Sequence, residues 1–273
     1  MPELITSPSN PKIKRLLALQ QKSSARREAG LFVVEGRREL QHCLDAGFEI
    51  DSIFVCPSLF VSDGVEPSGR DYSTPSPKSQ ETKVFEVSEE VYAKISYREG
   101  TEGVIAEVRT PERRLEEIAL PENPLVVVLE SVEKPGNLGA VLRSADAAGA
   151  DAVLVCDPLT DLWNPNLIRA SVGAVFTVPC VACSSEAAIA FLRARGIRIL
   201  TAQLQDSSLY YDCDMTGGTA IVMGTEATGL TPVWREAADA HIRIPMLGRL
   251  DSLNVSVSAA ILLFEAVRQR RNG

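Results

Sequence analysis

The last helix predicted from the sequence combines a clear apolar stripe with an unusually polar start. In DSLNVSVSAAILLFEAVRQR, residues 251–270, apolar side chains recur at three- and four-residue steps, which predicts a helix with one buried face. The segment begins with three polar side chains, Ser252, Asn254 and Ser256. Ser252 is placed to accept a hydrogen bond from the free amides of the first turn, which stabilises a helix by roughly 0.5–2 kcal/mol. Because a cap needs only one such residue, the others indicate a further role.

The same periodicity divides the first part of the chain into short helices and strands. We expect helices over residues 11–22, 37–48 and 89–96, and strands over residues 31–36, 50–56, 83–88 and 103–110. The strand, helix and strand at its start predict a βαβ unit. Residues 61–83 are rich in proline, serine and glycine without periodicity, which indicates an exposed loop or a short disordered insertion.

In the second part of the chain, strands and helices alternate. The all-apolar run over 125–130 is typical of a parallel strand buried on both faces. We expect further strands over 152–156, 177–181, 198–203 and 219–224, and helices over 138–149, 165–174, 186–196 and 231–238, with the segment 241–246 left without a type. This order predicts an α/β fold with a mostly parallel sheet. The polar, proline-bounded segment 110–123 is predicted to be a linker between a domain over 1–109 and a domain over 124–273.

Composition restricts the class of protein. The chain has 273 residues and 45% apolar content, enough for a core in each of two domains. Its six cysteines are scattered, which fits reduced thiols, and Cys180-x-x-Cys183 has no second pair of ligands, so we expect no metal site. The sequence has no apolar signal core and no apolar run of about 20 residues, so we expect a cytoplasmic protein with no membrane contact.

Charge is distributed unevenly along the chain. The net charge of −8 argues against binding of nucleic acid by bulk charge. Basic residues nevertheless outnumber acidic ones between Lys12 and Arg38. Such a run is typical of a solvated helix face, and it is also where a polyanion would bind.

Three loops follow predicted strands, at the edge where parallel sheets bind ligands. In the first, Pro135, Gly136 and Asn137 form a turn into a helix, with Arg143 two turns further along. The spacing of its glycines does not match a dinucleotide fingerprint, which argues against an NAD-dependent enzyme. The second loop is MGTEATGL, residues 223–230, with Glu226 between two glycines. The third is IPMLGRLDSLNV, residues 244–255, which delivers polar groups to a helix N-terminus.

Taken together, PGNLGAVLRSADAAG, IVMGTEATGL and IPMLGRLDSLNVSVSAAILLFE resemble the three ordered motifs of the SpoU (TrmH) family of RNA 2′-O-ribose methyltransferases, of the SPOUT class. The resemblance covers residues 124 to 270. More loosely, the first domain, with GLFVVEGRREL and GVIAEV, is similar to the ribosomal-protein-like domain that binds substrate RNA in this family. The resemblance implies a C-terminal deep trefoil knot, S-adenosylmethionine as cofactor, and a homodimer whose active site forms at the subunit interface.

The resemblance also implies roles for individual residues. Gly224, Ile244 and Leu253 are expected around the cofactor. The polar catalytic set maps onto Asn137, Arg143, Glu226, Ser252 and Asn254. Arg169, with Ser171, matches a segment expected to contact RNA or the second subunit. Phosphate contacts from the first domain are expected at Lys14, Arg15, Arg26 and Arg27.

The expected reaction is an in-line methyl transfer to a ribose hydroxyl of structured ribosomal or transfer RNA, in which positioning provides much of the acceleration. The family assigns removal of the hydroxyl proton to Arg143, yet a guanidinium is normally protonated, so both a base and an electrostatic clamp are open roles. Two alternatives to this reaction are an RNA-binding or ribosome-assembly relative without activity and a SPOUT enzyme that methylates a base nitrogen. The intact polar set argues against the first alternative, and the SLNVSVS segment argues against the second.

Overall fold

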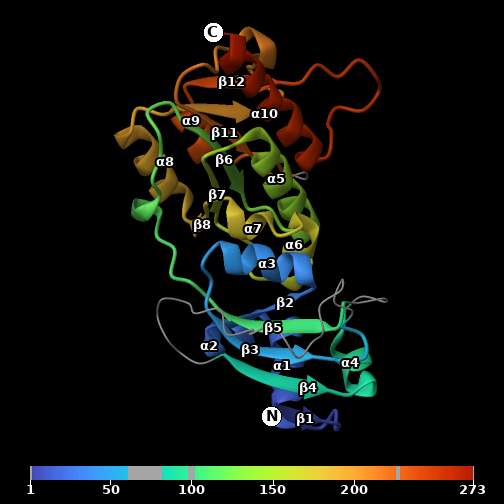
Figure 1. Ribbon diagram of the computed structural model, residues 1–273. Helices are drawn as coiled ribbons and strands as arrows, with labels where there is room; N and C mark the ends of the chain where they lie inside the picture. Colours follow the sequence, from blue (N-terminus) through green and yellow to red (C-terminus); the bar gives the residue numbers. More distant parts are fainter. Residues whose placement is uncertain (1, 61–81, 98–101, 226–227, 273) are drawn as a thin grey trace. The chain divides into compact units, whose positions relative to one another are not determined.

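The computed structural model describes residues 2–60, 82–97, 102–225 and 228–272, in two units (Figure 1). One unit comprises residues 1–111 together with 163–169, and the other comprises 112–162 and 170–273. The insertion predicted over residues 61–83 lies almost wholly outside the described residues. No described helix has both the length and the apolar character needed to cross a bilayer.

The first unit is built on a mixed sheet of β1 (Glu3–Ile5), β4 (Lys83–Val87), β3 (Ile50–Val55), β5 (Val104–Arg109) and β2 (Leu31–Glu35), in that spatial order. The core on one face of the sheet includes Ile13 and Leu16 of α1 (Pro11–Gln21) and Tyr92 of α4 (Glu89–Ile95). The remaining helices are α2 (Ser23–Ala29) and α3 (Arg37–Asp45), both of which contact β2. The helices and strands predicted in this part of the chain are confirmed, with ends shifted by a few residues.

The predicted βαβ start is modified by a later strand. β2 and β3 are parallel to each other, but β5 lies between them and is antiparallel to both. β5 comes from a distant part of the sequence, so local periodicity contains no information about this insertion. The strand β1, which pairs in parallel with β4, was not predicted either.

The second unit has a seven-stranded, all-parallel sheet. Its spatial order is β10 (Ser208–Leu209), β12 (Ala240–Arg243), β9 (Arg198–Ala202), β11 (Thr219–Met223), β6 (Leu125–Glu130), β7 (Ala152–Cys156) and β8 (Cys180–Cys183). Every residue of β6 is buried, as its apolar run predicts. The mostly parallel α/β fold predicted from the sequence is confirmed here, although the short strands β10 and β12 were not predicted.

Helices cover both faces of this sheet (Figure 1). The core on one face joins alternate strand residues, among them Val126 and Val128, to Phe191 of α8 (Ser185–Ala194) and Trp234 of α9 (Pro232–Ala237). On the other face, α5 (Pro135–Ala148) and α10 (Val255–Asn272) lie side by side. The single helix predicted over 165–174 is two helices, α6 (Pro165–Ser171) and α7 (Ala174–Thr177), because Gly173 adopts a left-handed φ of 89° between them.

The segment predicted as a linker, residues 110–123, is partly integrated into the second unit. It contains the short 3₁₀ helix η1 (Leu115–Glu117), whose Leu115 is buried in the core of this unit. Arg113 donates hydrogen bonds to the carbonyl oxygens of Val175 and Cys180. The boundary between the compact units therefore falls at Pro111, near the start of the predicted linker.

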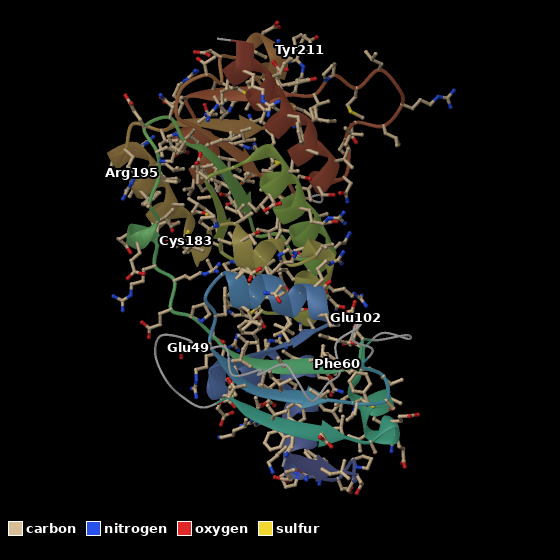
Figure 2. The ribbon with its side chains drawn as sticks, in the orientation of Figure 1. Glu49, Phe60, Glu102, Cys183, Arg195 and Tyr211 are labelled. Atoms are coloured by element: carbon tan, nitrogen blue, oxygen red, sulfur yellow. The ribbon has the colours of Figure 1, made fainter. Side chains whose placement is uncertain are left out.

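The six cysteines are free thiols. Cys156 of β7 and Cys183 of β8 face each other across the sheet, with their sulfur atoms 3.9 Å apart, and Cys183 is labelled in Figure 2. The hydrogen bond from Cys156 lowers the pKa of the Cys183 thiol, whereas the pKa of Cys156 is raised. Burial raises the pKa of Cys180 to about 12. No group of three or more histidine, cysteine and acidic side chains suited to a metal occurs in the described part of the chain.

Candidate active site

The three candidate loops emerge from one edge of the second sheet. β6, β11 and β12 belong to the same parallel sheet, so their carboxyl ends share an edge. The first loop runs from Ser131 to the start of α5, the second from Gly224 to Thr231, and the third from Ile244 to Asn254. Figure 1 shows the third loop extending away from the sheet before the chain returns to α10.

A side-chain hydrogen bond joins the first loop to the third. Asn254 Nδ2 donates to Asn137 Oδ1 at 3.2 Å, although the two residues are 117 positions apart. Asn254 Oδ1 accepts from the backbone N–H of Ser256 at 3.0 Å and from its hydroxyl at 2.6 Å. Asn254 therefore caps α10 with one side of its amide and contacts the first loop with the other.

This arrangement corrects the predicted cap and explains the polar start of the last helix. Ser252 is exposed and lies before the helix, so it does not cap it. Asn254 is the cap, and Ser256 orients the Asn254 amide. The polar cluster therefore holds Asn254 against Asn137, which is more than a cap alone requires.

The second loop folds back tightly on itself. The N–H of Gly229 donates to the carbonyl oxygen of Thr225 at 3.1 Å, and the N–H of Thr228 donates to the Thr225 hydroxyl at 3.0 Å. A Cβ atom at Gly224 would lie 2.4 Å from the carbonyl oxygen of Gly229, so only glycine fits there. Glu226, predicted in the catalytic set, lies outside the described residues.

The third loop presents apolar side chains. Leu247 and Leu250 are 97% and 76% exposed, and Leu253 is 37% exposed. Ile244, the first residue after β12, is half-buried. Two of the three predicted cofactor residues, Ile244 and Leu253, therefore belong to the third loop, and the other, Gly224, begins the second.

Arg143 stands apart from the Asn137–Asn254 pair. It is exposed on α5, and no described residue forms a hydrogen bond or ion pair with its guanidinium. Six positions on a helix correspond to a rotation of about 600°, which places Arg143 roughly 120° around α5 from Asn137. A ligand that contacts Asn137 directly is therefore not aligned with Arg143 of the same helix.

The basic residues predicted to contact RNA differ in their surroundings. Lys14 and Arg27 are exposed. Arg26 is only 4% exposed, and its guanidinium donates to the carbonyl oxygens of Leu19 and Gln20 in the last turn of α1. Because these helix-end carbonyls lack partners within the helix, Arg26 serves as a structural cap and not as a surface cation.

Arg15 is engaged by carboxylates. Its guanidinium pairs with Glu107, which is fully buried, and lies 3.4 Å from Asp51. The Ser52 hydroxyl also donates to Glu107 at 2.7 Å. Burial nevertheless raises the pKa of Glu107 above its ordinary value, because desolvation outweighs these contacts. Arg15 therefore neutralises an internal carboxylate.

The remaining predicted residues lie in and beside α6. Arg169 donates to the side chain of Asn166 at 3.3 Å. Ser171 is only 1% exposed, and its hydroxyl accepts from the N–H of Val175 at 3.4 Å. Ser171 therefore helps to join α6 to α7.

Comparisons with known proteins give the family of this chain. Residues 124–264 match the SpoU rRNA Methylase family, and residues 10–106 match the MRM3-like substrate binding domain. The chain is 28% identical over 260 residues, covering 95% of this chain and 97% of the relative, to the 23S rRNA (guanosine(2553)-2′-O)-methyltransferase RlmP of Bacillus subtilis.

The chain is also similar to solved structures of RNA methyltransferases. A crystal structure of an RNA 2′-O ribose methyltransferase matches with a TM-score of 0.80 and 41% identity, covering 98% of this chain and 99% of that one. An AdoMet-bound rRNA methyltransferase from Sinorhizobium meliloti matches with a TM-score of 0.84 and 31% identity, covering 97% of each chain. The protein is thus an S-adenosylmethionine-dependent RNA 2′-O-ribose methyltransferase. It belongs to the SpoU rRNA Methylase family, as the three sequence motifs predict.

One buried polar atom at this edge fits a ligand with hydrogen-bond donors. Gln203 follows β9, the strand between β11 and β12, and its side-chain oxygen is buried without a hydrogen-bond partner among the described residues. Its amide nitrogen donates to the carbonyl oxygen of Gln205 at 2.9 Å, which fixes the orientation of the amide. S-Adenosylmethionine carries amino groups that can donate to this oxygen, so the site fits the cofactor. Sequence reasoning missed Gln203, and the only signal is a polar residue directly after a buried strand.

Proposed function

We propose that the three loops at the carboxyl edge of the second sheet bind S-adenosylmethionine and methylate ribosomal RNA. The observation that carries this proposal is the Asn254–Asn137 hydrogen bond, which joins the third motif to the first at this edge. Gly224, Ile244 and Leu253 surround the cofactor, and Gln203 accepts a hydrogen bond from one of its amino groups. Asn137, Glu226, Ser252 and Asn254 orient the cofactor or the ribose.

The chain's own groups then assist an in-line displacement. The cofactor supplies an electrophilic methyl group on a sulfonium, and S-adenosylhomocysteine is the leaving group. The ribose 2′-oxygen forms a bond to the methyl carbon, the carbon–sulfur bond breaks, and the hydroxyl proton passes to water. In this proposal Arg143 holds an RNA phosphate beside the hydroxyl and stabilises the negative charge that develops on the oxygen.

We also propose a C-terminal trefoil knot. After β12 the chain must return past β9 and β11 to reach α10, which packs on the helix that follows β6. Near its end, α10 is bound to backbone groups that precede β6 and β11. Arg270 donates to the carbonyl oxygens of Pro124 and Gly217, and Gln269 accepts from the N–H of Met215. These contacts support a chain end that is threaded and then fixed.

A homodimer completes the site in this account. The third loop and α10 expose a run of large apolar side chains, Leu247, Leu250, Leu253, Val257 and Phe264. This run extends from the proposed cofactor site along α10, which favours a second copy of the chain as its occupant. Arg143 is exposed and rotated away from Asn137, so we assign it to the cofactor site of the other subunit.

Residues 1–109 form the proposed RNA-binding domain, connected through residues 110–123 to the catalytic domain over 124–273. Lys14, Arg15, Arg27 and Arg169 remain as proposed phosphate contacts, since Arg15 is exposed although it pairs with Glu107, while burial and internal contacts remove Arg26 from the set. The B. subtilis relative is named for 23S rRNA, which favours ribosomal over transfer RNA here. Such a substrate places the enzyme in the cytoplasm.

The substrate class is tested by incubating the protein with unmodified 23S rRNA, 16S rRNA and transfer RNA, each with methyl-labelled S-adenosylmethionine. We expect label in 23S rRNA, in a single 2′-O-methylnucleoside after digestion. The variant Arg143→Ala serves as a control and is expected to bind cofactor without transferring label. Label in transfer RNA alone would contradict the proposed substrate. Cofactor binding without label in any RNA, including intact ribosomal subunits, would instead favour a non-catalytic relative.

A further inference from the structure

The end of the second loop is bound to a buried carboxylate, Glu130. Glu130 is the last residue of β6 and is 3% exposed. Its two oxygens accept hydrogen bonds from one residue, Thr231, at 2.9 Å from the backbone N–H and at 2.6 Å from the hydroxyl. No described cation pairs with Glu130. A buried polar group is costly unless its hydrogen bonds are satisfied, so the two bonds from Thr231 offset part of the cost of burying the Glu130 side chain.

Thr231 uses its hydroxyl in an unusual way for its position. It is the N-cap residue of α9, where a threonine hydroxyl normally accepts from an amide of the first helical turn. Here the side chain makes no such bond and donates to Glu130, 101 positions away. The local stabilisation of α9 is thus replaced by a link between the end of β6 and the start of α9.

That link fixes the far end of the second loop. Leu230, the residue before Thr231, is buried, and a Cβ at Gly224 would lie 2.6 Å from the N–H nitrogen of Leu230. The beginning of the loop is fixed by β11, and the N–H of Gly229 donates to the carbonyl oxygen of Thr225. Glu130 therefore determines where the backbone of Gly224 lies relative to the first loop, which begins directly after it.

We infer that Glu130 and Thr231 are positioning residues that hold the second loop in its cofactor-binding conformation. The inference rests on the proposed contact between Gly224 and the cofactor. Without the link, the loop populates other conformations, and the apparent dissociation constant rises by the inverse of the competent fraction. Saturating cofactor selects the competent conformation again, so the maximal rate is preserved.

The test compares Thr231→Val, which removes the hydroxyl at nearly constant volume, with Thr231→Ser, which keeps it. We expect Thr231→Val to weaken S-adenosylhomocysteine binding, measured by calorimetry, about fivefold. Its KM for S-adenosylmethionine should rise by a similar factor, while kcat stays within about twofold of the wild-type value. Thr231→Ser should bind like the wild type, and Glu130→Gln, which keeps one acceptor, should lie between them.

A wild-type dissociation constant for Thr231→Val, even with a lower melting temperature, would overturn the inference and leave only a structural role. Leu253→Asp separates this failure from failure of the proposed site, because Leu253 is partly exposed and its replacement does not disturb the core. If Leu253→Asp weakens binding and Thr231→Val does not, the positioning role is wrong. If neither variant weakens binding, the cofactor site itself is wrongly assigned.

Discussion

Arg270 makes four of the hydrogen bonds that hold the end of α10, and its removal gives a sharp test of the fold. Arg270 donates four backbone hydrogen bonds: to Met215 at 3.0 Å, Asn123 at 2.9 Å, Pro124 at 3.0 Å and Gly217 at 2.7 Å. The substitution Arg270→Leu leaves all four carbonyl oxygens without this donor. A buried polar group without a partner costs about 1–3 kcal/mol.

Because Arg270 is only half-buried, water replaces part of these bonds, so we expect a loss of about 3–5 kcal/mol in the free energy of unfolding. Arg270→Lys should show about half of this loss, since an ammonium keeps some of the hydrogen bonds but cannot reproduce the planar fork of the guanidinium. Urea denaturation measures the loss, and Arg271→Leu, an exposed neighbour on the same helix, is the control. A loss below about 1 kcal/mol for Arg270→Leu, or an equal loss for Arg271→Leu, would refute the reasoning.

Three further predictions concern charge, thiols and assembly. Burial raises the pKa of Glu107 in the folded state above its value in the unfolded chain. The free energy of unfolding of the wild type, relative to that of Glu107→Gln, should therefore fall as pH rises above 4.5. Urea denaturation measures this difference, and a difference that stays constant with pH would contradict the prediction. Iodoacetamide should alkylate Cys183 well before Cys180. Cys183 is partly exposed and its pKa is lowered, whereas Cys180 is buried and its pKa is about 12. Peptide mass spectrometry measures the two alkylation rates, and equal rates would contradict the prediction. If Arg143 acts at the cofactor site of the partner subunit, inactive Arg143→Ala and Leu253→Asp chains that are refolded together should recover about one quarter of the wild-type activity. Half of the dimers are then hybrids, and each hybrid has one intact site. No recovery would place both residues in the site of the same subunit.

The sequence predicted the second unit well because its strands are buried on both faces. An unbroken apolar run such as residues 125–130 has few other interpretations once helices alternate with it. In the first unit the apolar pattern did not predict the order of the strands, because β5 inserts between β2 and β3. Strand order depends on contacts between residues that are distant in the sequence. The break at Gly173 escaped prediction because the apolar pattern continues across it.

The candidate site was predictable in outline, but its contacts were not. The resemblance of the three motifs to the SpoU family implied that Asn137 and Asn254 serve one site, and in the structure their side chains form a hydrogen bond. Periodicity cannot decide whether Ser252 or Asn254 caps the helix, because the bond to Asn137 fixes its start. Charge patterning likewise counted Arg26 as a surface cation, although the carbonyl groups at the end of α1 draw it inward.

The central claim is that this chain methylates a ribose hydroxyl of RNA with the site built around Asn137, Asn254 and Arg143. The most direct measurement is mass spectrometry of nucleosides from unmodified 23S rRNA after incubation with S-adenosylmethionine and either wild-type protein or Arg143→Ala. We expect one new 2′-O-methylnucleoside with the wild type and none with the variant. A methyl group on a base nitrogen, or equal 2′-O-methylation by Arg143→Ala, would contradict it.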